Sequence, residues 1–248
     1  MKILVCGKGG CGKSTISTLL AKEISRRGGK VLVIDTDESN FGLHSQLGVE
    51  APQDFMNYFG GKKLLFDQVK TLQKGWKIDE IPEEYLSEKE NIKLLAMGKI
   101  YDFGEGCACP INALSSKFLE VIELGKNEFL IADTDAGIEH LGRGVDKNCD
   151  IIIVVVEPSR ESIKLSKKIS EMAKAINKDF WYVLNKVDED TRDILLNSVE
   201  KDKVIAVIPR DERIFKNCLS GKELDVELEE VKKMVDVLEN LQKKKKSI

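Results

Sequence analysis

Residues 7–15 decide the fold, and they read Gly7-Lys8-Gly9-Gly10-Cys11-Gly12-Lys13-Ser14-Thr15. The stretch satisfies the phosphate-loop pattern G-x-x-x-x-G-K-[S/T]. The backbone amides of such a loop cradle phosphate groups, and its lysine, here Lys13, reaches the β- and γ-phosphates. The hydroxyl of Ser14 is expected on Mg²⁺. Residues 7–15 therefore predict a site for a nucleoside triphosphate with its magnesium ion.

The sequence on either side of the loop supports this interpretation. The apolar run Ile3-Leu4-Val5-Cys6 precedes it, as expected for a buried parallel strand. The apolar residues that follow recur at helical spacing: Ile16, Leu19, Leu20 and Ile24. Gly28-Gly29 then closes the helix. A strand, a glycine loop and a helix in this order aim amides and a helix N-terminus at phosphate.

Lys8 has no role in an ordinary phosphate loop. A lysine at this position resembles the deviant Walker-A class, which includes MinD, ParA and the nitrogenase iron protein. In that class the lysine reaches the nucleotide of a second subunit. The resemblance therefore implies ATP hydrolysis, in which Lys8 and Lys13 are both catalytic, by a working unit of two identical chains.

Apolar strand-like runs alternate with amphipathic helical segments along the rest of the chain. The predicted strands are Lys2–Cys6, Val31–Asp35, Lys93–Ala96, Phe129–Asp133, Ile151–Val156, Trp181–Asn185 and Val204–Ile208. Alternation of this kind predicts an α/β fold with a mostly parallel sheet and helices on both faces. We expect one domain over residues 1–248, with ligands at the carboxyl ends of the strands. Residues 57–90 are polar and irregular, and we expect a helical insertion there.

The C-terminal segment, about residues 222–243, predicts a helix with one apolar stripe. Its apolar residues alternate at spacings of four and three: Leu224, Leu228, Val231, Val235, Leu238 and Leu241. This stripe either packs on the sheet or lies on a membrane, as the C-terminal helix of MinD does. Membrane binding favours bulky aromatic residues on the apolar face, and this stripe has none. We therefore expect packing on the sheet and no stable membrane anchoring.

Composition narrows the possible functions further. The net charge of −3 and the pI near 5.7 give no indication of a nucleic-acid surface. No apolar run reaches the length of a membrane span, and the N-terminus has the pattern of a strand rather than a signal peptide. The 6 cysteines are typical of reduced thiols in a chain of this type. We expect a cytoplasmic protein.

Carboxylates follow two of the predicted strands. Asp35 and Asp37 end one strand, and residues two apart on a strand share one face. Asp37 lies further into the loop, so it is the better candidate to position or deprotonate the attacking water, while Asp35 would organise the Mg²⁺ shell. Asp133 ends the other strand and suits Mg²⁺, usually through water. Gly137, just beyond it, gives a backbone that can swing toward a γ-phosphate.

Asn185-Lys186-Val187-Asp188 has the form of the N-K-x-D motif that recognises a nucleotide base. In GTPases its final aspartate reads guanine. In the deviant Walker-A class the asparagine commonly contacts adenine, and the base packs near a proline-containing loop after the next strand. Pro209-Arg210 fits that loop. The residues alone permit ATP or GTP, and the class resemblance favours ATP and its product ADP.

Cys107 and Cys109 lie one residue apart in a glycine-flanked turn. Two thiolates make half of a tetrahedral site for a soft metal, and the chain offers no obvious further ligands. A two-fold dimer would supply four thiolates at its axis. Zn²⁺, Ni²⁺ or an iron–sulfur cluster could occupy such a site, and the spacing does not choose between them.

Four features together resemble the CooC family of ATPases, which mature nickel enzymes, chiefly carbon monoxide dehydrogenase. They are residues 7–15 with Lys8, the segment Asp133–Leu141, the pair Cys107 and Cys109, and Val156-Glu157-Pro158-Ser159. The resemblance covers most of the chain. It implies an ATP-driven homodimer that holds a metal between its subunits and helps to insert nickel into an active-site cluster.

Two alternatives stay open from the sequence. One is a positioning ATPase of the MinD or ParA type, which the cysteine pair and the lack of an aromatic anchor disfavour. The other is an iron–sulfur carrier or electron donor like the nitrogenase iron protein. That protein has a cluster cysteine just after the switch segment, whereas residues 133–144 here contain none. The sequence does not identify the nickel enzyme that the protein would serve.

Overall fold

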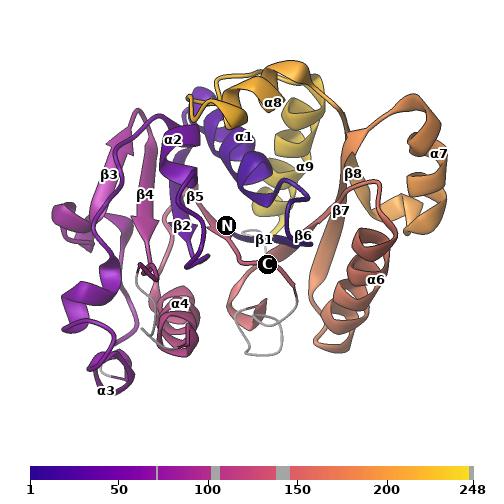
Figure 1. Cartoon of the computed structure of the whole chain (residues 1–248). Helices are drawn as coiled ribbons and strands as arrows, with labels where there is room; N and C mark the ends of the chain where they lie inside the picture. Colours follow the sequence, from indigo (N-terminus) through magenta and orange to yellow (C-terminus); the bar gives the residue numbers. More distant parts are fainter. Residues whose placement is uncertain (71, 102–106, 138–145, 246–248) are drawn as a thin grey trace.

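The computed structural model describes residues 1–70, 72–101, 107–137 and 146–245. Its centre is an 8-stranded sheet in the order β3-β4-β2-β5-β1-β6-β7-β8 (Figure 1). The pairs between neighbouring strands are parallel, except that β3 runs antiparallel to β4. The strands are β1 Lys2–Gly7, β2 Lys30–Asp35, β3 Leu86–Lys89, β4 Ile92–Ala96, β5 Glu128–Asp133, β6 Ile151–Val156, β7 Asp179–Val187 and β8 Val204–Pro209. The predicted α/β class with a mostly parallel sheet is confirmed.

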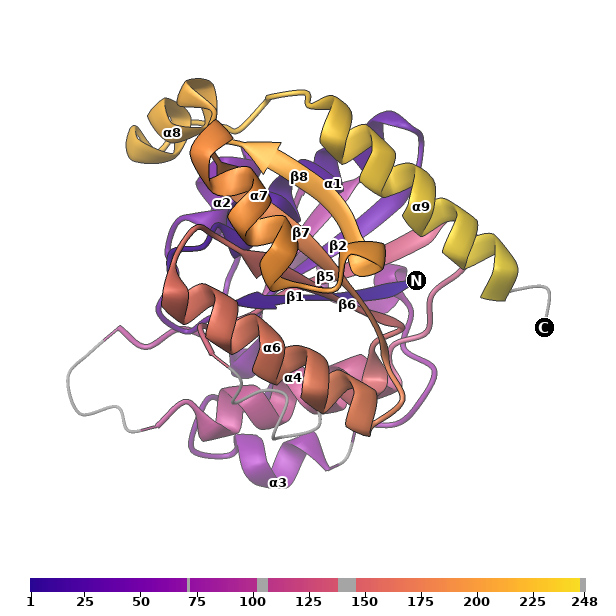
Figure 2. The same ribbon diagram turned by 90° about the vertical axis from the view of Figure 1, so that its right-hand side faces the viewer.

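Helices cover both faces of this sheet. They are α1 Lys13–Arg26, α2 Leu43–Leu47, α3 Leu65–Val69, α4 Cys109–Val121, α6 Arg160–Ala175, α7 Glu189–Ser198, α8 Glu212–Leu219 and α9 Glu229–Lys245. Figure 2 shows α1 and α9 on one side of the sheet and α4 and α6 on the other.

The core therefore has two apolar layers, one on each face of the sheet. Side chains of β1 alternate between them: Ile3 and Val5 pack with α1 and α9, whereas Leu4 and Cys6 pack with α4 and α6. This period of two is what an extended strand imposes. Because both faces are covered, β1 and β6 are apolar along almost their whole length, which is why the sequence showed them clearly.

Residues 57–90 differ from the predicted helical insertion. They contain one short helix, α3, together with short 3₁₀ turns and the edge strand β3. Around Phe55, just before this segment, aromatic rings gather: Tyr58, Phe59, Trp76, Tyr85 and Phe118 lie with ring centroids 5.3–6.1 Å from that of Phe55. The segment thus extends the apolar layer beside α4 and continues the sheet.

The C-terminal helix begins later than predicted, at Glu229. Leu224 and Leu228 precede it, yet both are buried, so the apolar stripe continues into chain that is not helical. Within α9, Met234, Val235 and Leu238 are fully buried, and the helix packs against α1 and β8. Among the described residues, no helix combines the length and the apolar character that crossing a membrane requires.

Candidate functional site

The residues predicted to bind nucleotide gather at the carboxyl edge of the sheet. Asp35 and Asp133 end the neighbouring strands β2 and β5 and are register partners. Gly7 ends β1 and lies beside Val155 of β6. This is the edge at which parallel α/β sheets bind their ligands, because the loops there diverge and leave a crevice.

Two glycines of the phosphate loop occupy positions that a side chain could not. Gly7 has φ +152°, and a Cβ on it would lie 2.5 Å from the carbonyl oxygen of Val155. Gly12 has φ +100°, and a Cβ on it would lie 2.3 Å from Asn185 Nδ2. The loop therefore packs directly against strands β6 and β7, and α1 starts at the residue after Gly12.

The first turn of α1 is arranged for an anion. Its N-cap, Gly12, provides no side-chain hydrogen bond, and the turn carries no acidic residue. The amides at the start of the helix are therefore available to phosphate, whose charge the helix dipole favours. Lys13 in this turn is buried. The loop thus has the local structure that its pattern predicts.

A hydrogen-bonded carboxylate lies under the loop. Asp133 is fully buried and accepts hydrogen bonds from Ser14 Oγ at 2.6 Å and Ser17 Oγ at 3.0 Å. Burial raises the pKa of Asp133 to about 6, against the opposing effects of Ser14 and Lys13. Asn40 Nδ2 also donates to Ser14 Oγ, at 2.9 Å. Ser14 and Asp133 thus form a compact oxygen site of the kind that Mg²⁺ prefers.

Asp35 lies beside this site but is bonded to protein groups. Its Oδ2 is 2.6 Å from Lys99 Nζ, and its Oδ1 accepts the amide of Asp37 at 3.1 Å. Burial raises the pKa of Asp35 to about 7, and the charge of Lys99 opposes that rise. Asp35 differs from Asp133 in that one of its oxygens is paired with a buried ammonium group, whose positive charge disfavours a second cation on that oxygen.

Asp37 lies in the loop that follows β2. Its Oδ1 accepts hydrogen bonds from the amide and the hydroxyl of Ser39, at 2.9 and 2.6 Å. Burial is the main cause of the raised pKa of Asp133, and the negative charge of Asp37 adds to it. The side chain of Asp37 is only half-buried, so water can reach it. Gly137, from the loop after β5, donates its amide to Gly7 O at 3.2 Å.

Lys8 forms an ion pair within its own chain. Its Nζ lies 3.0 Å from Glu157 Oε1, and Lys186 Nζ lies 3.0 Å from Glu157 Oε2. Although burial opposes it, hydrogen bonds from the two lysines hold the pKa of Glu157 below its usual range. Lys186 also donates to Gly10 O, and Asn185 Nδ2 donates to Cys11 O at 2.8 Å. The N-K part of the predicted base motif therefore braces the phosphate loop.

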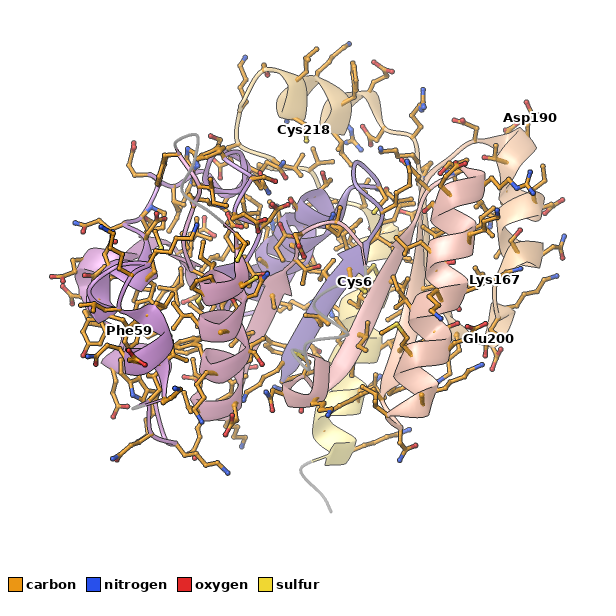
Figure 3. All side chains as sticks on the ribbon, turned by 60° about the horizontal axis from the view of Figure 1, so that its bottom comes forward. Cys6, Phe59, Lys167, Asp190, Glu200 and Cys218 are labelled. Carbon is orange, nitrogen blue, oxygen red and sulfur yellow. The ribbon has the colours of Figure 1, made fainter. Side chains whose placement is uncertain are left out.

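A pocket of about 590 Å³ adjoins the loop, and α8 forms one of its walls. Its lining includes Gly10, Gly12, Thr15, Asn185, Pro209 and Arg210, which were all predicted to bind the nucleotide. Ile214, Phe215 and Cys218 of α8 add a largely apolar surface, and Figure 3 labels Cys218 on that helix. A flat base suits such a pocket. The described residues that line the pocket do not include Asp188, the last residue of the predicted base motif. Asp188 lies at the N-terminus of α7.

The cysteines differ sharply in their surroundings. Cys11 is fully buried in the core, and burial raises the pKa of its thiol to about 11. Cys107 and Cys109 are exposed, and Cys109 begins α4. Hydrogen bonds with Cys109 hold the pKa of Cys107 below its usual value. Thiolates bind metals, and a helix N-terminus favours them, so this donor set suits a soft cation. In the described part of the chain, His, Cys, Asp and Glu side chains form no group of three able to hold a metal ion.

The comparison with protein families agrees with this geometry. Residues 2–224 match the CobQ/CobB/MinD/ParA nucleotide binding domain. The chain belongs to this family. An uncharacterized ATP-binding protein of Methanocaldococcus jannaschii is 52% identical over 247 residues, covering 96% of this chain and 99% of the relative. The carbon monoxide dehydrogenase accessory protein CooC of Rhodospirillum rubrum is 32% identical over 225 residues, covering 86% and 85%.

Solved structures of the family share the fold. The septum site-determining protein MinD of Pyrococcus horikoshii, determined with Mg-ADP, superposes with a TM-score of 0.70 at 20% identity, covering 97% of this chain and 96% of that one. Membership of the family establishes a P-loop nucleotide-binding site in this chain, and with it ATP or ADP and Mg²⁺ as the implied ligands.

Three residues of this site were not predicted from the sequence as parts of it. They are Asn40, which bonds Ser14; Lys99, which pairs with Asp35; and Glu157, which holds Lys8 and Lys186. Glu157 was noted only as part of the CooC resemblance. No local spacing marks any of them, because each acts through a partner far away in the sequence. Residues 104–106 and 138–141, which also carried predictions, lie outside the described residues.

Proposed function

We propose that the protein is an ATP-hydrolysing homodimer that carries a metal ion and assists nickel insertion into carbon monoxide dehydrogenase or a related nickel enzyme. The proposal rests on the presence of two features in one chain. They are a phosphate loop that contains Lys8 and a pair of exposed thiols at the start of α4. The 32% identity to a CooC protein over most of both chains supports it.

We propose a role for each residue of the nucleotide site. Residues 7–15 would cradle the phosphates, with Lys13 on the β- and γ-phosphates. Ser14 and Asp133 would hold Mg²⁺, with Asp35 acting from behind them, and Asp37 would orient the attacking water. The pocket bounded by Asn185, Pro209 and Arg210 would take the base. Because the guanine-reading aspartate of the motif does not line this pocket, we propose ATP rather than GTP.

The metal would be cargo rather than a resident cofactor. Cys107 and Cys109 offer two thiols per chain, whereas a closed soft-metal site has four ligands. A second copy of the chain would supply the other two. Lys8 would meet the nucleotide of that copy after leaving Glu157. Lys186 would remain paired with Glu157, so this carboxylate would not be left without a cation. ATP binding would thus bring the two cysteine pairs together.

Hydrolysis can be tested with Asp37→Asn. We expect turnover of Mg²⁺-ATP by the unaltered protein and a loss of roughly 10²-fold or more in the variant, the usual effect of removing a general base. The altered chain should accumulate as an ATP-bound dimer. The control is Asp193→Asn, which changes an exposed aspartate on α7 and should leave turnover unchanged. Normal turnover by Asp37→Asn would exclude this residue as the catalytic group.

Nickel delivery needs a separate experiment. The protein would be loaded with Ni²⁺ and mixed with nickel-free carbon monoxide dehydrogenase from the same host and ATP. We expect activation by the unaltered protein and none by the double variant Cys107→Ser with Cys109→Ser, which should still hydrolyse ATP. Cys149→Ser, a change at a buried thiol, is the control. Activation by the double variant would contradict the role of the pair.

A further inference from the structure

Lys99 is a buried cation that belongs to no predicted motif. Its side chain is 7% exposed and pairs with the 5%-exposed side chain of Asp35, with Nζ and Oδ2 2.6 Å apart. The same Nζ donates to the backbone carbonyl of Asp37 at 2.5 Å. The ring of Phe41 lies over it, with its centroid 5.9 Å from Nζ. One ammonium group therefore holds the loop that carries the candidate catalytic aspartate.

Backbone bonds join the same two segments. Met97 N donates to Asp35 O at 3.0 Å, and Ile100 N donates to Glu38 O at 3.2 Å. Lys99 itself is anchored by its amide, which donates to Asp54 Oδ2 at 3.1 Å. The segment after β4, residues 97–100, is thus bonded to residues 35–38 along its backbone, and the side chain of Lys99 adds the charged contact.

The loop is connected onward to the magnesium site. Asn40 N donates to Asp37 O at 3.3 Å, so this carbonyl accepts both Lys99 and Asn40. The side chain of Asn40 then donates to Ser14 Oγ at 2.9 Å. A displacement of the Asp37 carbonyl would consequently be felt at Ser14, the residue expected on Mg²⁺.

Stability alone does not account for this ion pair. Burying a lysine and an aspartate carries a desolvation penalty that their attraction often only balances, and apolar replacements are frequently neutral or stabilising. What an apolar pair cannot do is donate to the Asp37 carbonyl. We propose that Lys99 is a positioning residue for ATP hydrolysis, which holds residues 35–38 so that Asp37 faces the γ-phosphate. This inference rests on the proposed function.

The variant that tests it is Lys99→Met, which keeps an unbranched side chain of nearly the same length and removes the donor. We expect kcat for ATP to fall by about 10²-fold, the effect of a small misplacement of a catalytic group, while the Kd for ATP is unchanged. The matched control is Lys93→Met on β4, the strand that precedes Lys99, because Lys93 pairs with Asp79 away from the site. It should keep the full kcat.

A second variant separates positioning from stability. Lys99→Met leaves Asp35 buried without its cation, which can lower the melting temperature. The double variant Lys99→Met with Asp35→Asn removes that charge. We expect it to recover the melting temperature and to keep the ATP affinity of the unaltered protein, while kcat stays low. Recovery of kcat together with stability, or a normal kcat in Lys99→Met, would overturn the proposal.

Hydrogen exchange gives a readout that does not depend on hydrolysis. In the unaltered protein the amides of Asp37, Ser39 and Asn40 are all hydrogen-bonded within the loop. We expect the peptide spanning residues 36–42 to exchange faster in Lys99→Met and in the double variant, but not in Lys93→Met. Unchanged exchange would refute the positioning role. A protein without ATPase activity but with this exchange pattern would refute only the proposed function.

Discussion

At the residue scale, the site depends on a few positions where only one residue type works. A side chain at Gly7 would collide with the carbonyl of Val155, and one at Gly12 would collide with Asn185. These glycines let the phosphate loop pack against β6 and β7, where Asn185 and Lys186 hold its carbonyls. The charged side chains around the loop are held in place by ion pairs with specific partners.

Substitutions of the two lysines of the loop should have different effects on ATP binding and on dimerisation. Lys13→Ala removes a charged contact to phosphate and should weaken ATP binding by about tenfold or more. Lys8→Ala should leave binding nearly intact but abolish ATP-induced dimerisation and hydrolysis, because its proposed target is in the other subunit. Calorimetry and light scattering would measure these effects, with Lys167→Ala on α6 as an exposed control (Figure 3). Normal dimerisation of Lys8→Ala would contradict the role in trans.

Asp133 should make the nucleotide-free protein less stable as the pH rises. Its pKa is about 6 in the folded chain and near 4 when unfolded, so the unfolded chain loses this proton first. The stability linked to this group is therefore present below about pH 4 and lost between about pH 4 and pH 6. Asp133→Asn, measured by urea unfolding with a chelator, should gain on the order of 2 kcal/mol at pH 7 and less at pH 4.5. A gain independent of pH would count against this explanation.

At the element scale, strand register and helix ends assemble the chemistry. Asp35 and Asp133 are far apart in the sequence but are paired residues at the ends of β2 and β5. Glu157 and Asn185 are likewise brought to the site by their strands, because Glu157 follows β6 and Asn185 lies near the end of β7. Helix N-termini complete both candidate sites, since α1 begins at the phosphate loop and α4 begins at Cys109.

The start of α4 should be the reactive part of the chain toward alkylating agents. Cys107 is exposed with a lowered pKa, so a larger share of it is thiolate at neutral pH. Cys11 is buried with a raised pKa and should react only after unfolding. Iodoacetamide labelling at pH 7 followed by peptide mass spectrometry would compare them, with buried Cys149 as a second protected thiol. Labelling of Cys11 at the rate of Cys107 would contradict this order.

At the scale of the whole molecule, two apolar layers pack the sheet against its helices and leave the carboxyl edge for ligands. The nucleotide pocket opens between the phosphate loop and α8, while the cysteine pair lies at the start of α4. A single chain thus carries a nucleotide site and two exposed thiols, and in the proposed dimer the binding of nucleotide would bring the thiols of two chains together.

Metal content should therefore follow the dimer. We predict one metal ion per two chains, bound by Cys107 and Cys109 of each, with binding that weakens as the pH falls because protons compete for the thiolates. If ATP and metal both favour the dimer, each should tighten the binding of the other by the same factor. Elemental analysis and calorimetry with and without a non-hydrolysable ATP analogue would test this. One ion per chain, or full metal retention after Cys107→Ser with Cys109→Ser, would end the shared-site model.

The sequence by itself determined the parallel core of the fold and the nucleotide loop. Buried parallel strands are apolar on both faces, so β1, β2, β5 and β6 are visible as continuous runs, and the loop is a local pattern. The edge strand β3, Leu86–Lys89, was missed because it is short and only partly buried and carries charged residues. The start of α9 was predicted too early because Leu224 and Leu228 are buried in chain that is not helical, at a spacing that resembles that of a helix.

Only the tertiary structure decided which charged groups meet. Nothing near Lys99 in the sequence indicates that it pairs with Asp35, or near Glu157 that it holds both Lys8 and Lys186. A charge pair is formed by whichever side chains the sheet order brings together, and that order depends on long-range packing rather than on local pattern. The sequence therefore predicts the groups that touch phosphate, whereas the residues that hold those groups in place emerge only from the folded chain.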